Sequence, residues 1–127
     1  MTQPKFNTKV RGNFFAGRFS SPLDVQGEWT LKSPADFSDE IGRIQYSYLA
    51  IDESIQSATS AFKTWRKRSL SERASLLKNY QAALRKREAE LIEMISREVG
   101  KPLWEAKTEV AAMIQKVDIT IDEGLRC

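Results

Sequence analysis

The sequence predicts an α+β fold that is predominantly helical, with a small antiparallel β-meander followed by three or four helices. Short aromatic and apolar runs separated by turn residues occupy the chain up to residue 47. From there on, apolar residues recur at steps of three and four, which places them on one face of a helix. The chain has 127 residues, the length of one domain.

Residues 1–12 carry no periodic pattern and are predicted to form a flexible N-terminal arm. Residues 13–47 hold three runs that we expect to be strands: "NFFAGRF", "GEWTLKS" and "IGRIQYS". Three strands with a single apolar face are not self-sufficient, so we expect another element to cover them.

The helices are expected to fill residues 48–127. The first begins at Ser47, a plausible N-cap, and runs to about Lys67. A second opens at Ser69, which has the spacing of a capping box with Glu72, and continues as one long or kinked segment to Gly100. The apolar face of the first helix consists of Ile51, Ile55, Ala58, Phe62 and Trp65.

The stretch "VGKPL" at residues 99–103 predicts a corner between two helices. Gly100 stands where a left-handed residue ends a helix, and Pro102 suits the first turn of the next. We therefore expect Lys101 to be a solvated turn lysine.

The final helix follows a long apolar stripe at steps of three or four. Three further apolar residues, Trp104, Ile114 and Ile119, fall off this stripe, so the helix needs cover on more than one side. The stripe consists of Leu103, Ala106, Val110, Met113, Val117, Ile121 and Leu125.

The composition excludes several functions. A formal charge of +3 is too slight to indicate a polyanionic partner. The absence of histidine removes the commonest general base and zinc ligand. Cys127 is the only cysteine, so no internal disulfide can form, which fits a reducing cytoplasmic compartment. No run approaches the ~20 apolar residues that cross a bilayer. We therefore expect a cytoplasmic protein that uses neither a metal ion nor a membrane.

Four features are candidates for a chemical site. The basic runs at residues 63–68 and 85–87 could bind nucleic acid, but both lie at or near helix ends and precede acidic residues, so we expect no such binding. Glu105 and Glu109 could form an acid and base pair, but no partner in the sequence would shift their pKa values, so we expect exposed charges. Cys127 lacks an activating base. With no glycine-rich phosphate loop either, we expect no catalytic, cofactor-binding or metal-binding residue.

An ordered series of motifs resembles the N-terminal quarter of the NAD(P)-dependent aldehyde dehydrogenases, over about residues 13–125. The motifs are "FFAGRF", "SPADFSDEIGRI", "SATSAFKTWRKRSLSERASLLKNY" and "ELIEMISREVGKPLWEAKTEV". Ala16, Arg18 and Val99 depart from the family's usual residues. The stretch "GKPLWEAKTEVAAMIQKVDI" is especially similar to succinylglutamate semialdehyde dehydrogenases, which suggests an amino-acid-derived semialdehyde as substrate.

The resemblance implies that residues 13–127 form the N-terminal part of an NAD-binding domain. The family's nucleotide-binding strands and its catalytic Asn, Glu and Cys come later in the chain, so NAD or NADP would be bound by the full-length enzyme and not by this fragment. We expect the fragment alone to be inactive. Its partner would be the remainder of the dehydrogenase or another copy, joined through apolar helix faces, and the enzyme would be a homo-oligomer. The alternative is a stand-alone helical interaction module without enzymatic activity.

Overall fold

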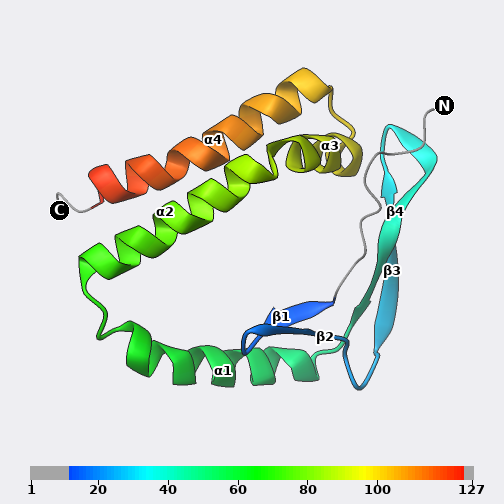
Figure 1. The fold of residues 1–127 in the computed structure, drawn as a ribbon. Coiled ribbons are helices and arrows are strands. Elements are labelled where there is room, and N and C mark those ends of the chain that lie inside the picture. Colours follow the sequence, from blue (N-terminus) through cyan, green and yellow to red (C-terminus); the bar gives the residue numbers. More distant parts are fainter. Residues whose placement is uncertain (1–11, 125–127) are drawn as a thin grey trace. The chain divides into compact units, whose positions relative to one another are not determined.

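The computed structural model describes residues 12–124 and confirms an α+β fold that is mainly helical (Figure 1). The described residues form two compact units. The first comprises residues 12–33 and 37–67, and the second comprises residues 34–36 and 68–124. The first unit holds most of the strand residues and one helix, whereas the second holds three helices.

The first expected strand is instead a hairpin. Strand β1 (Asn13–Phe15) pairs antiparallel with β2 (Arg18–Ser20). Ala16 and Gly17 join them with φ values of 52° and 75°, and two positive φ angles in a row are typical of a type I′ turn. The hairpin aligns the rings of Phe14 and Phe19 across the strands, with centroids 4.8 Å apart.

The other strands form a second hairpin, so the predicted meander of three strands is wrong. Within the described residues, strand β3 (Gly27–Ser33) pairs only with β4 (Asp36–Tyr46), and β1 pairs only with β2. The segment "PADFSDE", which lies between the second and third expected strands, mostly belongs to β4. Trp29 and Tyr46 place their rings 5.7 Å apart. The strand residues thus lie in two separate two-stranded sheets.

Helix α1 (Leu49–Trp65) has nearly the predicted extent and ends two residues before Lys67. Its N-cap is Tyr48 and not Ser47, although the Ser47 hydroxyl accepts a hydrogen bond of 3.2 Å from the backbone N–H of Leu49. None of the residues of α1 is buried.

The second unit contains α2 (Leu70–Lys86), α3 (Glu88–Val99) and α4 (Leu103–Asp122). The capping box is confirmed: the Ser69 hydroxyl accepts from the N–H of Glu72, and the Glu72 carboxylate accepts from the N–H of Ser69. The segment expected to be long or kinked is interrupted at Arg87, whose φ of −109° and ψ of 16° leave the helical range, so it forms two helices, α2 and α3.

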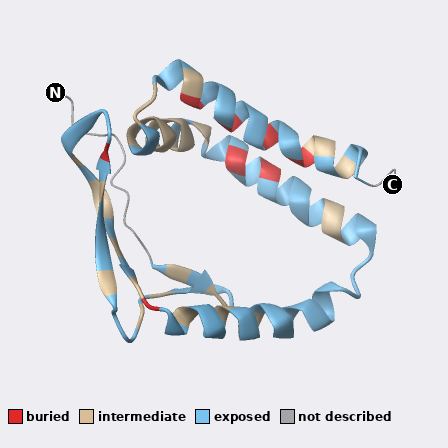
Figure 2. Cartoon of the chain, turned by 180° about the vertical axis from the view of Figure 1, so that it is seen from behind, coloured by how far each residue is buried: buried red, intermediate tan, exposed pale blue. Residues whose placement is uncertain are grey.

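Helices α2 and α4 run antiparallel. Lys78 contacts Asp118, and Gln81, which comes later in α2, contacts Ile114, which comes earlier in α4. Figure 2 shows buried residues on both helices. The hydrophobic core of this unit joins residues of all three helices: Leu84, Leu91, Ile92, Ile95, Val110 and Ile114.

The stripe predicted for α4 is correct at Ala106, Val110 and Val117, which are buried. It is wrong at Met113, which is 38% exposed while the adjacent Ile114 is buried. Leu103, at the start of the helix, is exposed. The expected end of the stripe at Leu125 lies outside the described residues, as does Cys127.

Candidate functional site

The corner between α3 and α4 is built as predicted around Gly100. Its φ of 72° is left-handed, and a Cβ atom at this position would lie 3.1 Å from both the Ala35 nitrogen and the Pro34 Cγ. Glycine is therefore needed for its backbone angle and for its size. Pro102 precedes α4 as its N-cap, one position earlier than the expected first turn, and its carbonyl accepts from the N–H groups of Glu105 and Ala106 at 3.1 Å.

Lys101 is not the solvated turn lysine that the sequence predicts. Its side chain is only 15% exposed, and its Nζ donates to the carboxylates of Glu105, at 3.3 Å, and Glu109. Its own carbonyl accepts from the Ser96 hydroxyl at 2.7 Å. The first two turns of α4 place both carboxylates beside the corner, because residues four apart share a helix face.

One ammonium group faces two carboxylates in this cluster, and this decides its chemistry. Hydrogen bonding to Glu109 raises the pKa of Lys101, and Glu105 adds to the effect, so the ammonium form persists at neutral pH. A protonated lysine is neither a nucleophile nor a base. Sequence reasoning did not identify Lys101 as the partner of Glu105 and Glu109. We interpret the three residues as a clamp that holds α4 against the corner.

A second polar cluster joins α2 to α4. Asp118 accepts from Lys78 Nζ at 2.5 Å and from Gln81 Nε2 at 2.7 Å, and Gln81 also donates to the Ile114 carbonyl at 2.8 Å. Gln81 is 2% exposed. Hydrogen bonds from Lys78 and then Gln81 lower the pKa of the Asp118 carboxyl. A buried amide whose donors are satisfied fixes the register of two helices. The contacts support this role for Gln81 between α2 and α4.

Sequence reasoning missed this cluster. The available signal was Gln81 itself, a polar residue four positions after Leu77 and three before Leu84, within the apolar stripe of α2. A polar residue at such a position needs hydrogen-bond partners from the helix that packs on it.

The basic runs differ in their surroundings. In the run at residues 85–87, Arg87 pairs with Glu90 at 2.7 Å, and Arg85 lies 4.0 Å from Asp118 and donates to Gln81. Its two arginines therefore have acidic or amide partners within the unit, in line with the expectation from the neighbouring acids. The run at residues 63–68 covers the end of α1, where cations suit the helix dipole.

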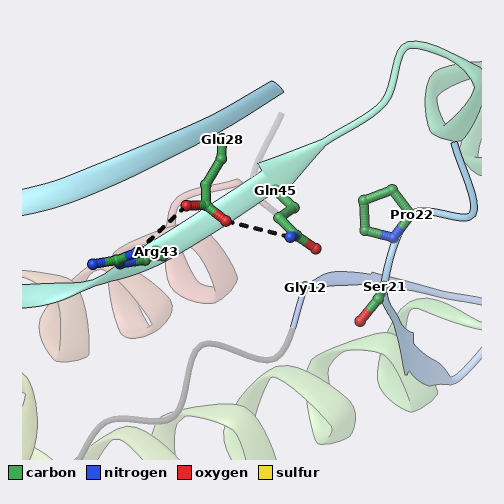
Figure 3. Close-up of a pocket in the computed structure, with 6 residues that line it drawn as sticks. All are labelled: Gly12, Ser21, Pro22, Glu28, Arg43 and Gln45. Carbon is green, nitrogen blue, oxygen red and sulfur yellow. Dashed lines mark hydrogen bonds and ion pairs between the residues drawn. The ribbon is translucent and has the colours of Figure 1, made fainter. Parts of the chain in front are cut away.

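A pocket of about 210 Å³ lies in the first unit, between the β3–β4 hairpin and residues flanking β1 and β2 (Figure 3). Glu28 is its central charge and accepts from Gln45 Nε2 at 3.3 Å, with Arg43 Nη1 3.9 Å away. Arg43 also donates to Glu40 at 2.8 Å, and this hydrogen bond raises the pKa of Arg43. The other lining residues are Gly12, Ser21 and Pro22.

The pocket offers little chemistry. Its carboxylate, Glu28, is already paired with a cation and an amide, and its arginine stays protonated. Within residues 12–124, no group of three or more His, Cys, Asp or Glu side chains could hold a metal ion.

The starts of α2 and α4 do not suit the pyrophosphate of a nicotinamide dinucleotide. Its pyrophosphate needs free N–H groups at a helix start or a glycine-rich turn. At α2 that position is taken by the carboxylate of Glu72, and at α4 the carboxylates of Glu105 and Glu109 would repel a phosphate. No chemical step through the cofactor is therefore assigned to these residues.

The aldehyde dehydrogenase family model matches residues 26–126. The chain therefore belongs to the aldehyde dehydrogenase family, which confirms the resemblance in its sequence motifs. None of the described helices is both long and apolar enough to cross a membrane.

The chain is similar to the N-succinylglutamate 5-semialdehyde dehydrogenase of Chromobacterium violaceum, with 35% identity over 109 residues, which are 80% of this chain and 22% of that protein. The enzyme of the same name from Paraburkholderia xenovorans is 44% identical over 71 residues, covering 56% of this chain and 15% of its own. A solved variant of Thermus thermophilus 1-pyrroline-5-carboxylate dehydrogenase matches 91% of this chain and 22% of its own, with a TM-score of 0.80 and 27% identity. The match thus spans 15% to 22% of the length of these relatives.

Proposed function

We propose that this chain is the N-terminal structural part of an NAD(P)-dependent aldehyde dehydrogenase and that it does not catalyse the reaction alone. The complete enzyme would oxidise an amino-acid-derived semialdehyde to the acid in the cytoplasm, as a homo-oligomer with NAD or NADP. The observation that carries the proposal is the match of 80% of this chain to only 22% of the Chromobacterium violaceum dehydrogenase.

The contacts of the second unit support a structural role. Gly100 and the Lys101 clamp set the corner between α3 and α4, and Gln81 with Asp118 sets the register between α2 and α4. Each of these polar groups is satisfied by a neighbour within the unit, so the three helices form a preorganised support. Such a support would buttress the cofactor-binding domain of the complete enzyme.

The semialdehyde substrate is supported by the names of the relatives. Two of them are named for N-succinylglutamate 5-semialdehyde. Because the matched region contains no residue that we assign to substrate binding, the choice of semialdehyde depends on the remainder of the enzyme.

The test compares two proteins in the same assay, with N-succinylglutamate 5-semialdehyde and either NAD⁺ or NADP⁺. One is the chain alone. The other is a chimera in which the chain replaces the segment of the Chromobacterium violaceum dehydrogenase to which it aligns. We expect reduced nicotinamide from the chimera and none from the chain.

Two results would contradict the proposal. Turnover or micromolar NAD⁺ binding by the chain alone would show that it carries its own cofactor site. A chimera that folds but neither binds NAD⁺ nor turns over would instead favour a stand-alone interaction module.

A further inference from the structure

Helix α1 carries an apolar face whose large side chains are about half exposed. Four large side chains lie on it: Ile51, Ile55, Phe62 and Trp65 are 52%, 58%, 57% and 40% exposed. With Ala58 they fall within roughly 80° of arc at 100° per residue, so they form one continuous stripe. We call these five residues the α1 stripe.

The exposed area of the α1 stripe is that of a binding surface. Aromatic side chains have roughly 150–250 Å² to bury, so two aromatic and two isoleucine side chains at about half exposure leave on the order of 400 Å². A patch of this size is about the largest that monomeric proteins leave in contact with water, and it is often functional. The opposite side of the helix carries polar residues such as Gln56 and Ser60.

Charges mark the two ends of the α1 stripe differently. Asp52 lies near its start, whereas Arg66 lies near its end. A partner that covers the stripe would therefore present an apolar surface with cations near Ile51 and carboxylates near Trp65, because complementary charges set the orientation of an interface.

The solved relative indicates where such a partner comes from. Its match covers 91% of this chain, and the part left outside the match is shorter than α1. The relative therefore contains at least part of this helix. Its polypeptide is more than four times as long as the matched region. We propose that the α1 stripe packs against the part of an aldehyde dehydrogenase polypeptide that lies outside the region matched here. This inference rests on the proposed function and names the surface through which it operates.

The experiment compares a variant with a new carboxylate on the α1 stripe with a second variant that carries the same charge on the opposite side of the helix. Phe62→Glu puts a carboxylate in the middle of the stripe, and Ser60→Glu is its matched control on the polar side of the helix. Phe62→Ala is a milder second variant that adds no charge. Each is made both in the free chain and in the chimera with the Chromobacterium violaceum dehydrogenase.

The expected effect depends on context. In the free chain, Phe62→Glu should leave the helix content and the urea midpoint of unfolding unchanged, because the side chain is exposed there. In the chimera, Phe62→Glu should lower the soluble yield and kcat/KM by at least about tenfold, and Phe62→Ala by less, since a buried anchor is lost. Ser60→Glu should change neither protein.

Four outcomes would overturn the proposal. An active chimera that tolerates Phe62→Glu would refute docking through the stripe while leaving the proposed function intact, whereas an inactive unmutated chimera would refute the proposed function itself. A free chain destabilised by Phe62→Glu would mean that its own residues cover the stripe. A free chain that light scattering shows to be a dimer, broken by Phe62→Glu while the chimera is unaffected, would make a second copy the occupant.

Discussion

Replacing Gly100 with alanine tests the corner between α3 and α4. Three effects contribute. Left-handed backbone costs an L-residue about 1–2 kcal/mol, and the new Cβ would press on Ala35 and Pro34 at 3.1 Å, which adds the roughly 1–3 kcal/mol typical of overpacking. Alanine also makes the unfolded chain less flexible than glycine does, which offsets about 0.4–1 kcal/mol of this destabilisation. We expect Gly100→Ala to destabilise the second unit by about 2 kcal/mol.

The assay is thermal and urea unfolding followed by circular dichroism. For a unit of this size, about 2 kcal/mol corresponds to a drop in Tm of roughly 10 °C. Gly17→Ala is the matched control, because Gly17 has a φ of 75° but, apart from its chain neighbours, no atom lies within 4 Å of the position that the new methyl group would take, so it isolates backbone strain from crowding. A Gly100→Ala protein within about 0.5 kcal/mol of the unmutated chain, the usual range for surface changes, would refute the reasoning.

Three further predictions follow from the second unit. Ser69→Ala removes the capping box of α2 and should cost about 1 kcal/mol in urea unfolding; an unchanged midpoint would contradict the role of the cap. Val110→Ala should cost about 2–3 kcal/mol, since Val110 is 0% exposed and its lost methyl groups leave a cavity; a loss below about 1 kcal/mol would mean that the core relaxes around it. The hydrogen bond from Lys78 is the largest cause that holds the pKa of Asp118 below its ordinary 3.8, so the stabilising effect of this carboxylate should be present above pH 3.8 and be lost as the pH falls further. Asp118→Asn should therefore make the free energy of unfolding depend less on pH across this acidic range. An unchanged pH profile would contradict the pairing.

The parts of the fold that the sequence predicts best are those with a local physical cause. The Ser69 and Glu72 spacing identifies the start of α2, and Gly100 before Pro102 identifies the corner, because each residue type satisfies a need of its own backbone.

The parts that sequence reasoning missed have weak local signals. Ala16 takes a φ of 52°, which alanine rarely does, so nothing in "FFAGRF" announced a hairpin. No glycine or proline marks the break at Arg87. Met113 and Ile114 are adjacent on α4, and only the position of the neighbouring helices decides which of them is buried.

The candidate site was predictable in its residues but not in its contacts. The sequence singles out Lys101, Glu105 and Glu109, yet it suggests solvated charges for all three. Their pairing depends on α4 starting directly after the corner, which brings two successive turns of carboxylates beside one ammonium group. Distances of this kind follow from tertiary geometry and not from spacing alone.

The rate at which the chimera reduces NAD⁺ with N-succinylglutamate 5-semialdehyde tests the central claim most directly. If this chain supplies the structural part of such an enzyme, the chimera should reach a kcat within about tenfold of the Chromobacterium violaceum dehydrogenase, a difference of only about 1.4 kcal/mol in the barrier. A correctly folded chimera with no measurable reduction of NAD⁺ would contradict the account.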